Sequence, residues 1–223
     1  MKAVILAAGV GSRLGKPYPK SLNKLPNGET ILGRQIRILR KNGINEIYVV
    51  VGFKMGLIME SFPEVFYRYN PVYYVTNTSK SLLCAIRDMN DDVLWTNGDV
   101  IFDEEIIAHM VNQAGNAIAV NSSKCGEEEV KYKADNKNQL TAISKQVQDA
   151  HGEAVGINKI SKEDIENFKS ALENCSDNDY FEKGIEMLID NGKKFNIVNI
   201  SNFKCIEVDF EEDWKIATEL FTQ

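Results

Sequence analysis

Residues 6–21 read LAAGVGSRLGKPYPKS, a stretch that combines three glycines with one arginine and two lysines. It overlaps the apolar run KAVILAA at residues 2–8, which predicts a buried strand of a parallel sheet. A glycine-rich turn after a first strand commonly binds phosphate, because bare N–H groups and missing side chains let anionic oxygens approach. A tight turn with solvated basic residues is the alternative interpretation of this stretch.

Two familiar phosphate-binding motifs do not fit. The dinucleotide fingerprint GxGxxG needs a third glycine where Leu14 stands, and the next apolar run ends VVVGF without an acid for a ribose hydroxyl. A Walker A loop would need one more residue before Gly15 and Lys16, and Pro17 stands where a serine or threonine should hold magnesium. A dinucleotide-binding oxidoreductase is therefore disfavoured.

The composition is that of an ordinary soluble protein of 223 residues, with 43% hydrophobic and 26% charged residues. The net charge of -6 disfavours a nucleic-acid partner. No window approaches the ~18 uninterrupted apolar residues of a membrane helix, and the first apolar run is too short for a signal peptide. We therefore expect a cytoplasmic protein without a membrane partner. The scattered cysteines form no CxxC pair, so no zinc or redox motif is present.

Strands and helices alternate in the first half of the chain. Apolar runs predict strands at residues 2–8, 46–52 and 92–102, the last ending in a turn, and a short strand followed by an extended piece at 65–75. Helical periodicity predicts helices at 29–43, 53–62, 79–89 and 103–115. This alternation is typical of a parallel, doubly wound sheet.

Beyond residue 115 the pattern changes. Short strand-like runs at 116–123, 128–135, 139–147 and 152–160 are separated by turn residues. Two helices, two late strands and a C-terminal helix follow, and they are expected at 161–175, 179–194, 194–200, 204–210 and 211–221. The sequence thus predicts an α/β fold with a mostly parallel central sheet flanked by helices, plus a small β-rich subregion.

The opening stretch supports a more specific identification. LAAGVGSRL followed by Pro19 and Lys20 resembles the signature LAAGxGxRL…PK of the nucleotidyltransferases that activate sugar phosphates and phosphoalcohols. The resemblance implies a single Rossmann-like, GT-A-type domain over residues 1–223. It also implies that the turn wraps the nucleotide, that Arg13 meets the outgoing phosphates and that Lys20 bridges the reacting ones.

Further segments resemble the same family. TNGDV supplies Asp99 as a magnesium ligand and EVD supplies Asp209 as the second one, although an aspartate after glycine is by itself more often a turn residue. Arg13, Lys20 and Asp99 are the expected catalytic residues. The expected nucleotide-binding residues are Leu6, Ala7, Ala8, Gly9, Gly11, Ser12, Thr76, Asn77 and Ser81. A helix cap explains some of the residues around position 77 equally well, and the QPxGLAxA-like pattern of sugar-specific members is missing.

The acceptor-binding residues are expected in the second half. Lys145 in ISKQV resembles the lysine of the family's EKP segment, although both the glutamate and the proline are missing, and a solvated lysine is the alternative. Glu153 lies in the next family element. Tyr180 and Glu182 could form part of an aromatic and acidic cage for an ammonium group, although helix packing also explains an aromatic residue there. Residues 1–115 would then bind the nucleotide and residues 116–223 the acceptor.

The implied reaction joins an NTP and a phosphorylated acceptor and releases pyrophosphate, with Mg²⁺ as cofactor. The acceptor phosphate is already ionised near neutral pH, so no general base is needed. The short chain and the missing sugar motifs favour the phosphocholine cytidylyltransferase branch, with CTP as donor. Phosphocholine, phosphoglutamine or a similar compound would be the acceptor, for capsule or other cell-surface decoration. A sugar-1-phosphate nucleotidyltransferase using UTP, GTP or dTTP and a non-catalytic nucleotide sensor remain alternatives, and a monomer or homodimer is expected.

Overall fold

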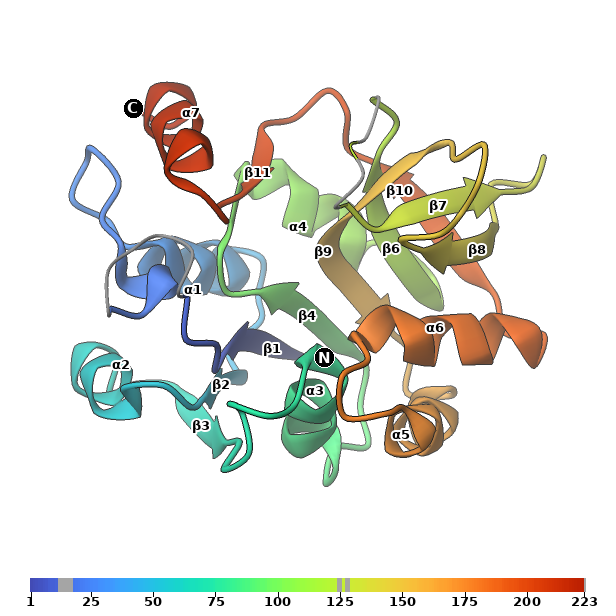
Figure 1. The fold of residues 1–223 in the computed structure, drawn as a ribbon, viewed down its shortest axis with the longest axis horizontal. Helices are drawn as coiled ribbons and strands as arrows, with labels where there is room; N and C mark the ends of the chain where they lie inside the picture. The colour runs from blue at the N-terminus through green and yellow to red at the C-terminus, as the bar shows by residue number, and fades with distance from the viewer. Residues whose placement is uncertain (12–17, 124–125, 127–128, 223) are drawn as a thin grey trace.

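The structure is a computed structural model, and it describes residues 1–11, 18–123, 126 and 129–222. Its central sheet has the strand order β10-β6-β9-β4-β1-β2-β3 (Figure 1). These strands are β1 (Lys2–Ala7), β2 (Ile47–Val51), β3 (Phe66–Tyr69), β4 (Val93–Asn97), β6 (Asn116–Asn121), β9 (Gly152–Ile160) and β10 (Phe195–Asn199). β9 runs antiparallel to β4 and β6, and the other neighbouring pairs along this path are parallel. The predicted α/β fold with a mostly parallel sheet is confirmed.

Helices cover both faces of the sheet because the strands carry apolar side chains on both sides. In β1, Val4 and Leu6 contribute to one core cluster, while Ala3 and Ile5 contribute to the other. The helices of the first cluster, which run from the lower centre to the right in Figure 1, are α3 (Thr78–Ile86), α5 (Ile165–Asn174) and α6 (Phe181–Asp190). Those of the second are α1 (Ile31–Lys41), α2 (Met55–Ser61) and α4 (Glu104–Val111).

The predicted strand at 92–102 is in fact two strands. The chain leaves the central sheet after β4, turns at residues 98–99, and continues as β5 (Val100–Phe102). β5 pairs antiparallel with β11 (Cys205–Glu207), and α7 (Glu211–Leu220) packs over this small ribbon through Ala217. The turn that separates β4 from β5 therefore opens at the carboxyl edge of the central sheet.

The β-rich part of the second half is smaller than its strand pattern suggests. β6, β9 and β10 complete the central sheet, because their side chains are buried on both faces. β7 (Lys131–Ala134) and β8 (Leu140–Ser144) form a hairpin that joins the same sheet off the path given above, through pairing of β7 with the first residues of β9. This hairpin lies next to α6 (Figure 1). In the described part of the chain, no helix combines the length and the apolar character needed to cross a membrane.

Candidate active site

A cavity of about 630 Å³ lies at the carboxyl edge of the sheet, where β1 and β4 end. Ligand sites of open α/β sheets commonly lie at this edge. Segments far apart in the sequence line it: the turn after β1, residues 97–99, the start of β9, the start of α6 and the segment from β11 to α7. The lining includes most of the residues expected from the sequence, namely Leu6, Ala7, Gly9, Gly11, Lys20, Asn77, Asp99, Lys145, Glu153, Tyr180, Glu182 and Asp209.

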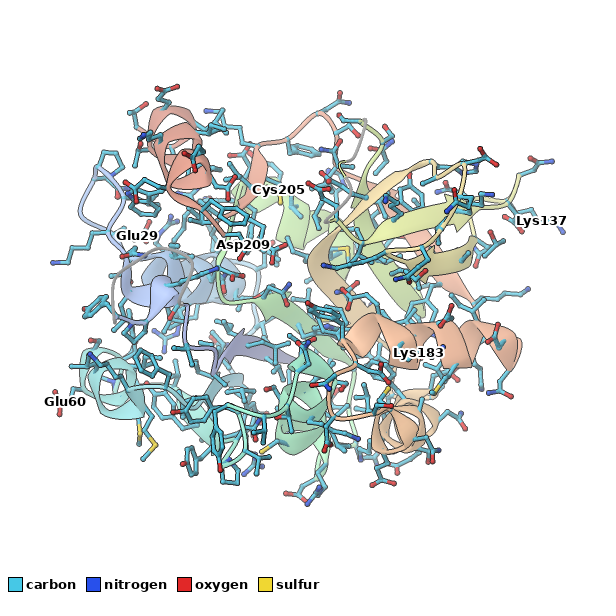
Figure 2. The ribbon with its side chains drawn as sticks, in the orientation of Figure 1. Glu29, Glu60, Lys137, Lys183, Cys205 and Asp209 are labelled. Atoms are coloured by element: carbon cyan, nitrogen blue, oxygen red, sulfur yellow. The ribbon has the colours of Figure 1, made fainter. Side chains whose placement is uncertain are left out.

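Lys20 joins two aspartates that lie far apart in the sequence. Its ammonium Nζ is 3.4 Å from Oδ2 of Asp99 and 2.5 Å from Oδ1 of Asp209. Lys20 comes from a short 3-10 helix (Lys20–Leu22), Asp99 from the turn between β4 and β5, and Asp209 from the residues after β11, where Figure 2 labels it. The three side chains expected to handle phosphate and metal therefore meet at one point.

A buried glutamine holds the turn that carries Asp99. Gln35, in α1, donates from Nε2 to the carbonyl oxygens of Asn97 at 2.9 Å and Val100 at 2.7 Å, and its Oε1 accepts from Thr96. Gly98 is needed in this turn, because a Cβ there would lie 2.6 Å from the carbonyl oxygen of Leu6. The turn is thus fixed from both sides.

The segment that carries Asp209 is held by the first turn of α7. The carboxylate of Asp213, in the first turn of α7, accepts from the backbone N–H groups of Asp209 at 3.0 Å and Phe210 at 2.7 Å. The N–H of Val208 donates to the carbonyl oxygen of Asp99 at 3.0 Å, which ties the two aspartate segments together.

A glycine makes room for the lysine. Gly11 has a φ of +63°, in the region that favours glycine, and a Cβ there would lie 2.7 Å from Cγ of Lys20. The second glycine of the opening motif therefore lets the Lys20 side chain pass along the turn into the cavity.

The electrostatics of this cluster follow from its burial. Burial lowers the pKa of Lys20, but the charges of Asp99 and Asp209 outweigh it, so the net pKa is raised above 10.5. Burial also raises the pKa of Asp99; the Lys20 ammonium opposes this effect and the Asp209 carboxylate adds to it. The Lys20 ammonium thus offsets the repulsion between the two carboxylates that lie next to each other.

The same carboxylates fit a magnesium site. Among the described residues there is no group of three or more His, Cys, Asp or Glu side chains arranged to hold a metal. Mg²⁺ does not need such a group, because one or two carboxylates together with substrate phosphates and water are its usual ligands. Asp99 and Asp209 already bind one cation together, the ammonium Nζ of Lys20. Their carboxylates therefore lie close enough to hold Mg²⁺ between them when that ammonium moves away.

Glu207 was not expected from the sequence, yet it lies in the same cavity. Burial, together with the nearby carboxylates of Asp99, Asp209 and Glu182, raises its pKa to about 8, and the Lys20 ammonium acts in the opposite direction. Its Oε1 lies 3.5 Å from Nδ2 of Asn97. Glu207 precedes Asp209 by two residues, and alternate residues of an extended segment share a face. The two-residue spacing from Asp209 is the sequence feature that could have indicated Glu207 as a residue of the same site.

The residues expected to bind the acceptor line the cavity near α6 and the β7–β8 hairpin. Glu182 is 7% exposed, and burial raises its pKa to about 7, with its own backbone N–H and Lys145 acting in the opposite direction. Nζ of Lys145 lies 5.1 Å from the ring centroid of Tyr180. Glu153 accepts from Asn121 at 3.3 Å, and burial raises its pKa.

Some expected residues are not brought to the cavity. Ala8 is buried in the core, and its carbonyl oxygen accepts from the N–H of Phe53. Thr76 and Ser81 accept from the amide of buried Asn70 and so organise the loop before α3; neither lines the cavity. Asn77 lines the cavity and also caps α3. Ser12 and Arg13 lie outside the described residues.

Comparison with known families agrees with this geometry. Residues 3–163 match the model of the MobA-like NTP transferase domain. The chain belongs to this family. The match covers the turn after β1, the Asp99 turn and β9, whereas Glu182, Glu207 and Asp209 lie beyond it.

Curated relatives of this chain carry different enzyme names. The chain is 32% identical over 133 residues to CMP-5'-(3-aminopropyl)phosphonate synthase of Streptomyces rubellomurinus, covering 56% of this chain and 21% of that protein. It is 33% identical over 217 residues to the bifunctional protein GlmU of Methanococcus maripaludis, covering 88% and 49%. It is 30% identical over 138 residues to CTP:phosphoglutamine cytidylyltransferase of Campylobacter jejuni, covering 56% and 54%. The matches thus span between about a fifth and about half of these relatives.

Solved structures share the fold over the whole chain. The inositol-1-phosphate CTP transferase of T. maritima superposes with a TM-score of 0.84 at 17% identity, covering 99% of this chain and 94% of that one. The CTP:phosphocholine cytidylyltransferase of Streptococcus pneumoniae gives a TM-score of 0.79 at 18% identity, with 98% and 97% covered. At these identities the likeness establishes the fold, and family membership rests on the sequence match.

Proposed function

We propose that this protein is a Mg²⁺-dependent nucleotidyltransferase that joins CTP and a small phosphorylated acceptor, with release of pyrophosphate. The observation that carries the proposal is the convergence of Lys20, Asp99 and Asp209 in a cavity at the carboxyl edge of the sheet. A cationic side chain between two carboxylates is suited to a reaction in which a metal and a phosphate chain are bound together.

The reaction needs positioning and charge neutralisation rather than a general base. An oxygen of the acceptor phosphate forms a bond to the α-phosphorus, and the bond from that phosphorus to the bridging oxygen breaks, so that the electron pair leaves with pyrophosphate. When bound, Mg²⁺ would neutralise charge on the phosphates, held by Asp99 and Asp209. Lys20 would then turn from the carboxylates to the reacting phosphates, and Gln35 and Asp213 would keep both aspartates in place.

We further propose that residues 1–115 bind the nucleotide and residues 116–223 bind the acceptor. The backbone at Gly9 and Gly11 lines the cavity on the nucleotide side, and Asn77 lines it where the base is expected. Arg13 is proposed to neutralise the leaving pyrophosphate, on the strength of the family signature. Lys145, Glu153, Tyr180 and Glu182 line the acceptor side.

CTP is preferred as the donor because two of the curated relatives make or use cytidine nucleotides by their names. Because other relatives are named GlmU, a sugar-1-phosphate nucleotidyltransferase that uses UTP, GTP or dTTP is the second candidate. A nucleotide sensor without turnover is less consistent with an assembled lysine and aspartate cluster. The product class would serve the decoration of a cell-surface polysaccharide, and the protein would act in the cytoplasm as a monomer or homodimer.

The test is a pyrophosphate-release assay that crosses CTP, UTP, GTP, ATP and dTTP with phosphorylated small molecules, with and without Mg²⁺. We expect release with CTP that needs both Mg²⁺ and an acceptor. Release only with hexose 1-phosphates would replace the cytidylyltransferase proposal by the sugar-phosphate one. Binding of nucleotide without release for any acceptor would favour the sensor.

A further inference from the structure

The cavity contains more negative charge than its proposed nucleotide site explains. Its described lining has two lysines, Lys20 and Lys145. The carboxylates of Asp99 and Asp209 are matched by Lys20, and that of Asp213 by backbone N–H groups. The carboxylates that remain on the lining are those of Glu129, Glu153, Glu182 and Glu207. A cavity that binds two phosphorylated molecules should be cationic, so these glutamates call for a positive charge from a ligand.

Glu182 makes this requirement specific. It is 93% buried, as follows from its exposed fraction of 7%, and its Oε2 has no hydrogen-bond partner in the described structure. A buried carboxylate oxygen without a partner is costly to the fold. Burial accordingly raises the pKa of Glu182 to about 7, even though the charge of Lys145 acts the other way. The fold keeps this carboxyl group on the cavity wall without satisfying it.

Lys145 lies close enough to lower the pKa of Glu182, but no ion pair joins the two among the described contacts. The Lys145 ammonium lies instead over the ring of Tyr180. The cavity lining thus carries a cationic group, Lys145, and an anionic group, Glu182, that no described ion pair joins. This is the charge pattern complementary to a short zwitterion that carries a phosphorus oxyanion at one end and a cation at the other.

The lining favours hydrogen bonding over an aromatic cage. A quaternary ammonium is typically held by aromatic faces. Of the three aromatic residues on the lining, Tyr180 has Lys145 over its ring, and Phe181 is 1% exposed with its ring packed edge-on against Trp95. Phe210 belongs to the Asp209 segment instead. Carboxylate oxygens accept hydrogen bonds, and a primary ammonium offers three N–H donors whereas a quaternary one offers none.

We propose that the acceptor is a short primary aminoalkyl phosphate or phosphonate, whose ammonium is bound by Glu182 while Lys145 binds its phosphorus oxyanion. This inference rests on the nucleotidyltransferase function proposed above and names its acceptor class. Glu153, which accepts a hydrogen bond from Asn121, and Glu207 line the same cavity.

The experiment measures pyrophosphate release with CTP and Mg²⁺ from matched acceptors: 2-aminoethyl phosphate, 2-aminoethylphosphonate, phosphocholine and ethyl phosphate. For the unmodified protein we expect kcat/KM for at least one aminoethyl compound to exceed that for ethyl phosphate and phosphocholine by about tenfold or more, since a buried charge-assisted contact is worth this much. Comparison of 2-aminoethyl phosphate with 2-aminoethylphosphonate shows whether the acceptor is a phosphate ester or a phosphonate.

Glu182→Gln keeps the shape of the side chain and removes its charge. We expect the preference for the aminoethyl acceptor over ethyl phosphate to fall about tenfold, mainly through KM, because the contact serves binding throughout the reaction. Glu186→Gln is the matched control: Glu186 lies one turn further along α6, pairs with Lys183 at 2.6 Å and does not line the cavity. The control should keep the full preference.

The outcomes separate the two proposals. No pyrophosphate with any nucleotide and acceptor would overturn the function itself. Release with sugar or inositol phosphates but not with aminoethyl compounds would leave the function standing and overturn the acceptor class. Phosphocholine used as well as 2-aminoethyl phosphate would overturn the primary ammonium. The acceptor panel on the unmodified protein decides these points even if Glu182→Gln fails to fold.

Discussion

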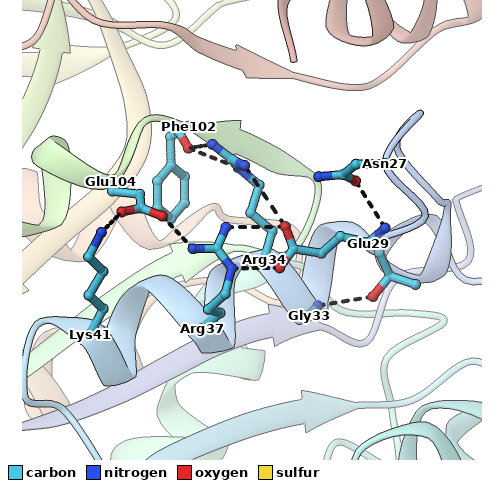
Figure 3. A network of polar contacts seen from close by, with 9 residues as sticks. Asn27, Glu29, Gly33, Arg34, Arg37, Lys41, Phe102 and Glu104 are labelled. Carbon is cyan, nitrogen blue, oxygen red and sulfur yellow. Dashed lines mark hydrogen bonds and ion pairs between the residues drawn. The ribbon is translucent and has the colours of Figure 1, made fainter. Parts of the chain in front are cut away.

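Two groups of charged side chains differ in how many of their members have a partner of opposite charge within the chain. Around α1 an ion-pair network joins Glu29, Arg34, Arg37, Lys41 and Glu104, and of these Arg34 is buried (Figure 3). Arg37 donates to Glu29 at 2.8 Å and also pairs with Glu104, which in turn pairs with Lys41. Every member of this network has a partner of opposite charge within the chain.

The cavity has the opposite character. Seven carboxylates and two lysines belong to its described lining, and Glu182 keeps an unpartnered oxygen while buried. Charges that serve the fold are satisfied by other residues, as around Arg37, whereas charges left unmatched in a cavity indicate ligands. Each prediction below changes one member of one group and asks whether turnover or stability responds.

The largest effect is expected from Asp99→Asn. It removes one of the two carboxylates proposed to hold the metal, and loss of one such charge-stabilising group typically lowers kcat by about 10² to 10³. Pyrophosphate release measures turnover, and thermal unfolding checks the fold. Glu104→Gln in the surface network is the control and should keep full turnover. A variant Asp99→Asn with near-normal release would remove Asp99 from the mechanism.

The second effect concerns stability and its pH dependence. Burial raises the folded pKa of Glu182 to about 7, above the 4.5 of an unperturbed glutamate. The folded state therefore binds this proton more tightly than the unfolded state, so stability falls as pH rises from about 4.5 to 7. Near pH 8 we expect Glu182→Gln to raise the free energy of unfolding by on the order of 1–3 kcal/mol.

Urea unfolding near pH 8 and near pH 5 measures this difference. The gain should shrink at the lower pH, where the native carboxyl group is already neutral. Glu60→Gln on exposed α2, where Figure 2 shows Glu60 at the edge of the molecule, should change neither value. An unchanged or lower stability of Glu182→Gln near pH 8 would mean that the chain itself satisfies this carboxylate.

The sequence predicted that Lys20, Asp99 and Asp209 act together because each resembles a position of a known family's motifs, and in the structure their side chains meet. It did not indicate Gln35, whose place in an amphipathic helix shows nothing of the two carbonyl groups that it binds across the core. It predicted 92–102 as one strand ending in a turn and did not separate β4 from β5, although polar Thr96, Asn97 and Asp99 already interrupt the apolar run. Thr76 and Ser81 were assigned to the nucleotide because their segment stands where the resembled family binds base and ribose, but here the amide of Asn70 donates to both hydroxyl groups.

A smaller effect is expected on metal binding. Lys20→Met keeps a long side chain but frees both carboxylates from their ammonium, so the nucleotide-free protein should bind Mn²⁺ about tenfold more tightly, a change of about 1.4 kcal/mol. Electron paramagnetic resonance of free Mn²⁺ measures this affinity. Lys24→Met removes an exposed lysine of the same segment and should leave it unchanged. Equal Mn²⁺ affinities for Lys20→Met and the unmodified protein would mean that Asp99 and Asp209 do not bind the metal ion.

The smallest effect is expected from Arg37→Gln. Arg37 is 45% exposed, and exposed ion pairs contribute roughly 0.2–1 kcal/mol each, so the free energy of unfolding should fall by only about 1 kcal/mol. Added salt should reduce this loss, because it screens exposed pairs, and pyrophosphate release should not change. Arg34, in the same network, donates to the carbonyl oxygen of Phe102 at the end of β5, the strand that follows Asp99. A clear loss of turnover in Arg37→Gln would therefore mean that the surface network positions Asp99 through Arg34, and the distinction between the two charge groups would fail.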